Sequence, residues 1–188
     1  TLSMLQSSCP LSATALSVLH YSCFHPSQNR VVYVPRPLQV DYQAAWQHTV
    51  EAFQQLLDTC PPQVRVSLEF KPTDEATRYA IVPSTGAALL LGQQIGRANI
   101  GLTLDFGHLL MAGENPAQSI VLAAQAGMLF GLHLNDAHVR LGAEDGLVLG
   151  SVNAVAALEL VRWLQRVGYD GHIYFDTFPR SEDPVREA

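Results

Sequence analysis

Strand-like and helix-like segments alternate along most of the chain, and this alternation limits the folds open to it. A helical pattern begins near residue 41, and strand and helical patterns then follow one another until a last strand near residue 177. Such alternation predicts a parallel sheet with helices packed outside it. The strand segments are almost continuously apolar, which is typical of strands covered on both faces. We therefore expect an α/β fold with parallel strands.

The predicted elements have clear sequence boundaries. Helices are expected at residues 41–59, 86–96, 116–127 and 152–168, and strands at residues 64–70, 99–106, 128–136 and 172–177. Asp41 can cap the first helix, and Ser84 or Thr85 can cap the second. Pro116 suits a first helical turn, and Gly168 suits a helix end. The chain from residue 41 onward therefore has recognisable starts and stops for each element.

Composition narrows the class of protein. The net charge of −6, with 11 basic and 17 acidic residues, disfavours nucleic acid as the main partner. Three widely spaced cysteines (Cys9, Cys23 and Cys60) show no metal or redox spacing and predict a reducing compartment, the cytoplasm. An acid-free stretch over residues 1–40 leaves organelle targeting as the alternative. No apolar run reaches the roughly 18 residues that a membrane span needs.

Each of the four predicted strands ends in a side chain that can bind a metal. Glu69 closes the first and Asp105 the second, His133 lies late in the third, and Asp176 closes the fourth. Parallel strands of a barrel bring their carboxyl ends to one face, so we expect these side chains to meet. Three carboxylates and one imidazole suit Mn²⁺, Mg²⁺ or Co²⁺, with Zn²⁺ as a less favoured choice.

Other polar residues lie close to these strand ends. Lys71 is the only lysine of the chain and follows Glu69 by two residues, so both point the same way. Its ammonium would stabilise negative charge that develops on a bound oxygen. His108 follows Asp105 by three residues and is a candidate ligand for a second metal bridged by Asp105. Further acids occupy the loop after the third strand: Asp136, Glu144 and Asp145.

Each residue taken alone has an ordinary structural explanation. An aspartate at a strand end commonly caps the next helix, as Asp105 would. A single histidine such as His133 is commonly a core or surface residue, and a single lysine such as Lys71 is commonly solvated. Four metal-competent side chains at four successive strand ends favour the metal site over these explanations.

The motifs around these residues resemble those of xylose-isomerase-like proteins. Glu69-Phe70-Lys71-Pro72 resembles the E-x-K-P segment of xylose isomerases and bacterial-type L-rhamnose isomerases. Residues 104–108 and 111–115 are similar to their carboxylate-x-G-H and M-A-G-x-N stretch. His133-Leu134-Asn135-Asp136 resembles the H-L-N-D strand end of L-rhamnose isomerases, sugar epimerases and endonuclease-IV-like enzymes, and Tyr174-Phe175-Asp176 resembles the F-D of the last strand.

The resemblance implies the last four to five βα units of a (β/α)8 TIM barrel. It covers residues 41–180, which leaves an irregular N-terminal segment at 1–40, with an optional strand at 31–34, and a polar tail at 181–188. We expect the chain to be a fragment or a truncated relative, because such a barrel usually needs at least about 200 residues. Exposed strand edges in a half-barrel predict self-association into a homo-oligomer.

The resemblance also implies two metals. Glu69, Asp105, His133 and Asp176 would hold a structural metal, and a catalytic metal would lie near Asp105 and His108. In the family an acidic segment completes the second site. The nearest match is Glu144-Asp145-Gly146, in which the last acid is replaced by glycine.

The activity implied is aldose–ketose isomerisation of a small sugar by a metal-assisted 1,2-hydride shift, with Lys71 steadying the charged oxygen. In the alternative, sugar epimerisation by proton transfer, Glu69 and Asp176 would be the two acid–base carboxylates. Epimerase relatives carry Glu at the last position, so Asp176 favours the hydride shift. A truncated non-catalytic relative is a further alternative. DNA cleavage of the endonuclease-IV type is disfavoured by the acidic net charge and by Lys71.

Overall fold

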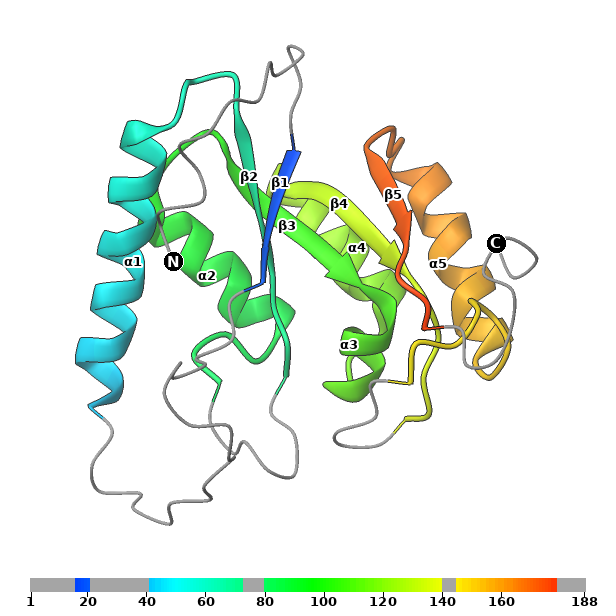
Figure 1. Cartoon of the computed structure of the whole chain (residues 1–188). Helices are drawn as coiled ribbons and strands as arrows, with labels where there is room; N and C mark the ends of the chain where they lie inside the picture. Colours follow the sequence, from blue (N-terminus) through cyan, green and yellow to red (C-terminus); the bar gives the residue numbers. More distant parts are fainter. Residues whose placement is uncertain (1–15, 21–40, 73–79, 140–144, 179–188) are drawn as a thin grey trace.

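The computed structural model describes residues 16–20, 41–72, 80–139 and 145–178. Strands and helices alternate along this part of the chain, except that two successive helices lie between the third and fourth strands of this order (Figure 1). The strands are β1 (Leu16–His20), β2 (Arg65–Glu69), β3 (Ile100–Asp105), β4 (Leu129–Leu134) and β5 (His172–Phe175). The helices are α1 (Tyr42–Thr59), α2 (Thr85–Ile95), α3 (Phe106–Met111), α4 (Pro116–Gln125) and α5 (Ala154–Arg166).

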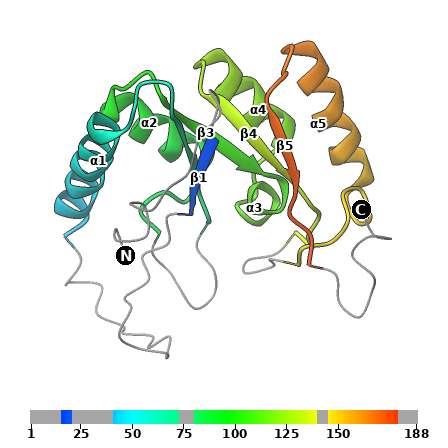
Figure 2. The ribbon, with the colours of Figure 1, turned by 45° about the horizontal axis from the view of Figure 1, so that its top comes forward.

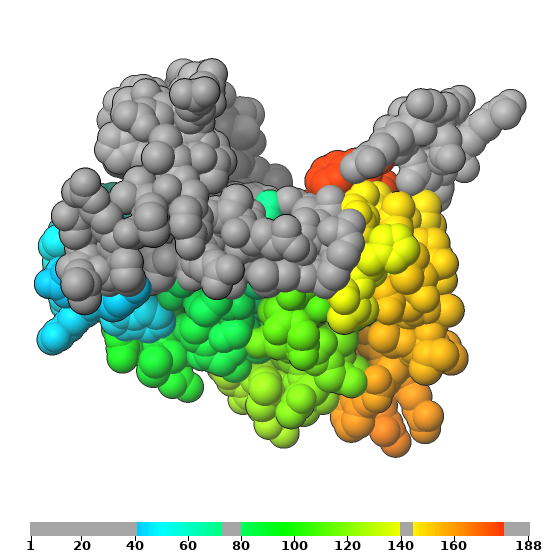
Figure 3. Space-filling model, turned by 90° about the horizontal axis from the view of Figure 1, so that it is seen from below, coloured from blue at the N-terminus to red at the C-terminus, as the bar shows by residue number. Residues whose placement is uncertain are grey.

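The strands form one parallel sheet in the order β1-β2-β3-β4-β5. Figure 2 shows the sheet curving, with the larger helices α1, α2, α4 and α5 on its outer side. In the space-filling view, the described residues follow one another in chain order from cyan through green and yellow to orange, and a red patch from the end of the described chain lies apart from them (Figure 3). The described elements therefore form a segment of a (β/α) barrel, as predicted.

Helix caps explain why the helices begin where they do. The Asp41 carboxylate accepts a hydrogen bond from the Ala44 amide at 2.9 Å, and the Ser84 hydroxyl accepts one from the Ala87 amide at 3.2 Å. Both caps were expected from the sequence. Asn115 caps α4 in the same way, with Pro116 in its first turn. Each cap accepts a hydrogen bond from a backbone amide of the first helical turn, which has no partner within the helix.

The two faces of the sheet carry different side chains. The outer face packs leucines against the helices, and the buried set comprises Leu68, Leu102, Leu104 and Leu132 from the strands with Leu91, Ile95, Ile120 and Leu160 from the helices. The inner face is polar, and the buried hydroxyls of Ser67 and Thr103 lie 2.7 Å apart across β2 and β3. None of the described helices is long and apolar enough to span a membrane.

The register between β3 and β4 shifts by one residue. Leu102 pairs with Leu129, whereas Thr103 pairs with Gly131, so Phe130 is the extra residue. Because of this shift Asp105 lies opposite His133. In an unshifted register Asp105 would instead lie opposite Leu132, which belongs to the outer core. The shift thus brings the aspartate and the histidine together.

Close packing at Gly101 accommodates the extra residue. A Cβ atom at Gly101 would lie 2.3 Å from Cγ of the Phe130 ring, so the ring occupies the space that a side chain would need. The Arg65 guanidinium lies 3.6 Å from the centre of the same ring. Glycine at this position therefore permits the Phe130 ring to pack against β3.

Two features differ from the sequence predictions, and two predicted segments lie outside the described residues. The strand β1 lies inside the segment 1–40, where the sequence predicted irregular structure apart from the optional strand at 31–34. The predicted strand 99–106 ends at Asp105, and Phe106 begins the short helix α3, which was not predicted. Residues 31–34 and the tail 181–188 lie outside the described residues.

Candidate metal centre

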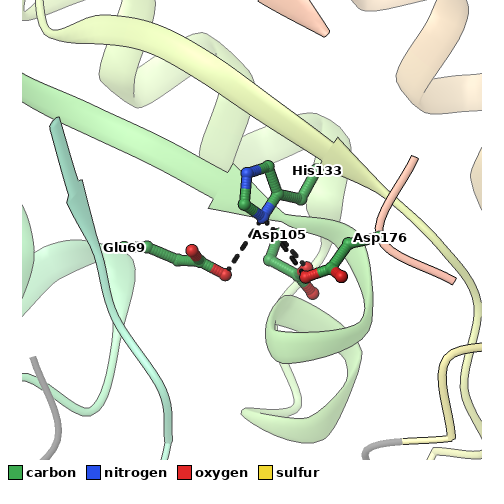
Figure 4. Close-up of side chains that lie close together, drawn as sticks. All are labelled: Glu69, Asp105, His133 and Asp176. Carbon is green, nitrogen blue, oxygen red and sulfur yellow. Dashed lines mark ion pairs between the residues drawn. The ribbon is translucent and has the colours of Figure 1, made fainter. Parts of the chain in front are cut away.

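Side chains from the ends of four neighbouring strands meet at one point (Figure 4). Glu69 is the last residue of β2, Asp105 the last of β3, His133 the last but one of β4, and Asp176 directly follows β5. Each offers one ligand atom, and the four atoms all lie within 4.8 Å of one another. The structure therefore brings together the four residues that the sequence predicted to meet.

The spacing fits a bound cation. His133 Nδ1 lies 3.2 Å from Glu69 Oε1, 3.5 Å from Asp176 Oδ2 and 3.9 Å from Asp105 Oδ2. Metal–ligand bonds of about 2.0–2.6 Å place neighbouring ligands about 3–4 Å apart. Glu69, Asp105 and His133 are buried, whereas 26% of the Asp176 side chain is exposed. The donor set and its spacing match those of a divalent-cation site.

Asp105 has two roles in the structure. Its Oδ1 accepts a hydrogen bond from the His108 amide at 2.8 Å, which caps α3, and its Oδ2 accepts one from Asn135 Nδ2 at 2.9 Å. Burial raises the pKa of Asp105, an effect that the neighbouring His108 partly offsets. The capping explanation and the cluster are therefore compatible, because each carboxylate oxygen can accept more than one contact.

His108 lies beside the cluster, on α3. Its Nδ1 is 3.5 Å from Glu69 Oε1 and 3.8 Å from Asp105 Oδ1. Both imidazoles thus approach the same oxygen of Glu69. His108 contacts two of the four residues but does not belong to the group of mutually close ligand atoms.

The charges around His133 favour its protonated form. Burial lowers its pKa, but the hydrogen bond and charge of Glu69, with the charges of Asp105 and Asp176, outweigh burial and raise it overall. A proton on Nδ1 occupies the direction in which a metal would bind. Protons and metal therefore compete for this nitrogen.

This competition predicts that metal affinity rises with pH. Below the raised pKa of His133, binding must displace one proton, so the Mn²⁺ affinity should increase about tenfold per pH unit until that pKa is passed. Calorimetric titration between pH 5.5 and 8 in buffers of different ionisation enthalpy measures both the affinity and the protons released. A His133→Gln variant is the control, and an affinity independent of pH in the unaltered chain would contradict the prediction.

Three further residues near the predicted site are Lys71, Glu144 and Asp145. Lys71 lies two residues beyond β2 and is half-buried. Glu144 lies outside the described residues. Asp145 is half-buried and accepts a hydrogen bond from the His138 amide at 2.9 Å. Among the described residues, neither Lys71 nor Asp145 belongs to the four-residue cluster.

The Asp136 carboxylate accepts hydrogen bonds from backbone amides of the loop that follows it. Its fully buried carboxylate accepts hydrogen bonds from the amides of Ala137, Val152 and Asn153 and from the Asn153 side chain. Burial raises the pKa of Asp136, but these hydrogen bonds outweigh burial and lower it overall. Asp136 therefore stabilises the loop between β4 and α5, where the sequence analysis had placed it only as a further acid.

Two residues near the site were not singled out from the sequence. Asn135 contacts Asp105, although it entered the sequence analysis only as part of a motif. Tyr174 pairs with His133 in the sheet, and the two ring centres lie 5.4 Å apart. The sequence signal for both was a position two residues away from a predicted ligand.

Comparison with known proteins agrees with this geometry. A family model described as xylose isomerase-like TIM barrel matches residues 15–188. The chain belongs to this family. Among sequence relatives of the xylose isomerase-like chain is xylose isomerase of Thermus thermophilus, 36% identical over 121 residues, which are 63% of this chain and 31% of the relative. Xylose isomerase of Streptomyces lividans is 33% identical over 122 residues, 64% of this chain and 30% of the relative.

Solved structures share the barrel fold. A D-tagatose 3-epimerase-like protein superposes with a TM-score of 0.62 at 17% identity, covering 86% of this chain and 55% of that protein. The IOLI protein, whose crystal structure holds a zinc atom, superposes with a TM-score of 0.59 at 21% identity, covering 76% of this chain and 50% of that protein. The chain thus spans about a third of its curated relatives and about half of these structures.

Proposed function

We propose that this protein is a divalent-metal-dependent isomerase that interconverts an aldose and a ketose. The observation that carries the proposal is the cluster of three carboxylates and one imidazole at four successive strand ends. The 36% identity to a xylose isomerase supports the choice of sugar chemistry. Because the chain spans only 31% of that relative, the activity of the whole protein is part of the proposal.

Glu69, Asp105, His133 and Asp176 are proposed to hold the metal, as Mn²⁺, Mg²⁺ or Co²⁺. When bound, such an ion supplies positive charge that polarises the carbonyl and hydroxyl oxygens of an open-chain sugar. The burial of Glu69 and Asp105 excludes water from the base of the site, which strengthens electrostatic interactions there. Asp176 is the most exposed of the four side chains.

Lys71 is proposed to stabilise negative charge on the substrate oxygen. It follows the buried Glu69 by two residues, and it is the only lysine in the chain. An ammonium positioned where charge develops contributes to the rate without gaining or losing a proton. Three carboxylates and one imidazole thus provide metal binding, whereas the single lysine provides a positive charge from the protein itself.

Sugar epimerisation is the second candidate. Two observations favour it. The structural relatives include proteins named as epimerases. The described residues form one cluster of metal ligands, whereas the resemblance to the isomerases implies two metals. Glu69 at the end of β2 and Asp176 directly after β5 both lie within 3.5 Å of His133 Nδ1. Carboxylates placed on two sides of a bound sugar can remove a proton from one face and return it to the other.

Turnover in deuterated water separates the two candidates. Aldoses and ketoses are incubated with the chain and Mn²⁺, and the products are identified by chromatography and mass spectrometry. Hydride transfer predicts an isomerised product with little deuterium at C2, because the hydrogen does not exchange with solvent. Proton transfer predicts deuterium at the epimerised carbon. Metal binding without turnover of any sugar would refute an enzymatic role for this chain and support a non-catalytic relative.

A further inference from the structure

We infer that Asn135 is a positioning residue that fixes the Asp105 carboxylate for metal binding. This inference rests on the proposed metal site and adds a residue to it. Asn135 is buried and lies directly after β4, two residues beyond His133. It therefore follows one proposed ligand in the chain and contacts another, Asp105, without belonging to the cluster itself.

The Asn135 side chain uses both ends of its amide. Its Nδ2 donates to Asp105 Oδ2 at 2.9 Å, and its Oδ1 accepts from the Gly107 amide at 2.7 Å. The reverse orientation of the amide would place two acceptors and two donors against each other, so the contacts define a single orientation. Asn135 thus joins the end of β4 to the end of β3 and to the first turn of α3.

The Asp105 carboxylate is consequently held from two sides. The His108 amide donates to Oδ1, and Asn135 donates to Oδ2, the oxygen that faces His133 Nδ1 at 3.9 Å. Each oxygen keeps a lone pair that can bind a cation. Donors of this kind fix the orientation of a ligating carboxylate before the metal arrives, which lowers the cost of binding.

The space around Gly107 fits the same role. A Cβ atom there would lie 2.9 Å from Asn135 Oδ1 and 3.4 Å from Asp105 Oδ1. The first of these distances is shorter than real Cβ contacts, so any side chain at position 107 would push the Asn135 amide aside. The absence of a side chain at Gly107 therefore allows the amide to reach both of its partners.

The test is Mn²⁺ affinity, measured by calorimetric titration of the full chain at fixed pH. Asn135→Ala should weaken binding about 10- to 100-fold, the usual loss when a residue that orients a ligand is removed. Asn99→Ala is the matched control: Asn99 Nδ2 also donates one hydrogen bond across strands, to the Val64 carbonyl at 3.1 Å, at the opposite end of the sheet. It should keep the affinity of the unaltered chain. The visible spectrum of bound Co²⁺ should change in Asn135→Ala and not in Asn99→Ala.

The outcomes separate this inference from the proposed function. Unchanged affinity and an unchanged Co²⁺ spectrum in a folded Asn135→Ala variant would overturn the role of Asn135 while leaving the metal site intact. Failure of the unaltered chain to bind Mn²⁺ or Co²⁺ would overturn both. If Asn135→Ala does not fold, Gly107→Ala decides, because the added Cβ displaces the amide without removing it. A folded Gly107→Ala variant with full affinity would then refute the inference.

Discussion

Mn²⁺ at one hundred times its dissociation constant is expected to raise the melting temperature of the chain by about 5–10 °C. Such an excess stabilises a binding-competent fold by about 2.7 kcal/mol. For a chain of 188 residues, each kcal/mol shifts the melting temperature by about 2–4 °C. Glu69→Gln should abolish this shift, because the amide removes a carboxylate ligand and the charge that faces both His108 and His133. Thermal unfolding with Mn²⁺ and with a chelator measures the difference.

The matched control for Glu69→Gln removes one acidic charge elsewhere. Asp58 is exposed and pairs with Arg97 at 2.7 Å, and the hydrogen bond from Arg97 lowers the pKa of Asp58. Asp58→Asn should therefore retain the full Mn²⁺ shift, since an exposed pair contributes little. Retention of the shift in Glu69→Gln would show that Mn²⁺ binds at another place.

Gly101→Ala is expected to destabilise the chain by about 1–3 kcal/mol, the usual cost of overfilling a packed site. The new Cβ would overlap the ring of Phe130, the extra residue at the register shift between β3 and β4. Displacement of Phe130 would also move His133, three residues farther along, away from its place opposite Asp105. Urea unfolding should thus show lower stability, and calorimetry should show weaker Mn²⁺ binding.

Gly86→Ala provides the control for the same chemical change. Gly86 lies in the first turn of α2, and a Cβ atom there would meet nothing within 4 Å. Alanine should stabilise this helix by about 0.4–1 kcal/mol. Adding Phe130→Leu to Gly101→Ala should restore part of the lost stability by freeing space. If Gly101→Ala is as stable as Gly86→Ala, the close packing of Phe130 does not hold the register.

The sequence predicted the helices and strands well where local chemistry sets their ends. Asp41 and Ser84 cap the helices that they were expected to cap, because their side chains bond to amides only three residues away. The short helix α3 was missed. Its residues continue the apolar run of β3, and the interaction that starts it is the Asp105 cap, which the sequence offered only as an alternative to metal binding.

The cluster of four side chains could be predicted because parallel strands fix where their carboxyl ends lie. The register shift at Phe130 could not, since a pattern of alternating residues does not show where one strand carries an extra residue. The roles of Asn135 and Asp136 could not be assigned from the sequence either. They are adjacent polar residues after the same strand, and the sequence does not distinguish their roles. Asn135 orients Asp105, whereas Asp136 holds the loop that leads into α5.

The position of β5 at the edge of the sheet has a thermodynamic consequence for the fourth ligand. β5 pairs only with β4 in the described part of the chain, and all four of its residues are exposed. Edge segments of this kind open locally at a lower free energy than central strands. Binding of a metal ion by Asp176 would therefore include the entropic cost of ordering this edge strand. Metal occupancy of the site and protection of the β5 amides from hydrogen exchange with solvent would then depend on each other.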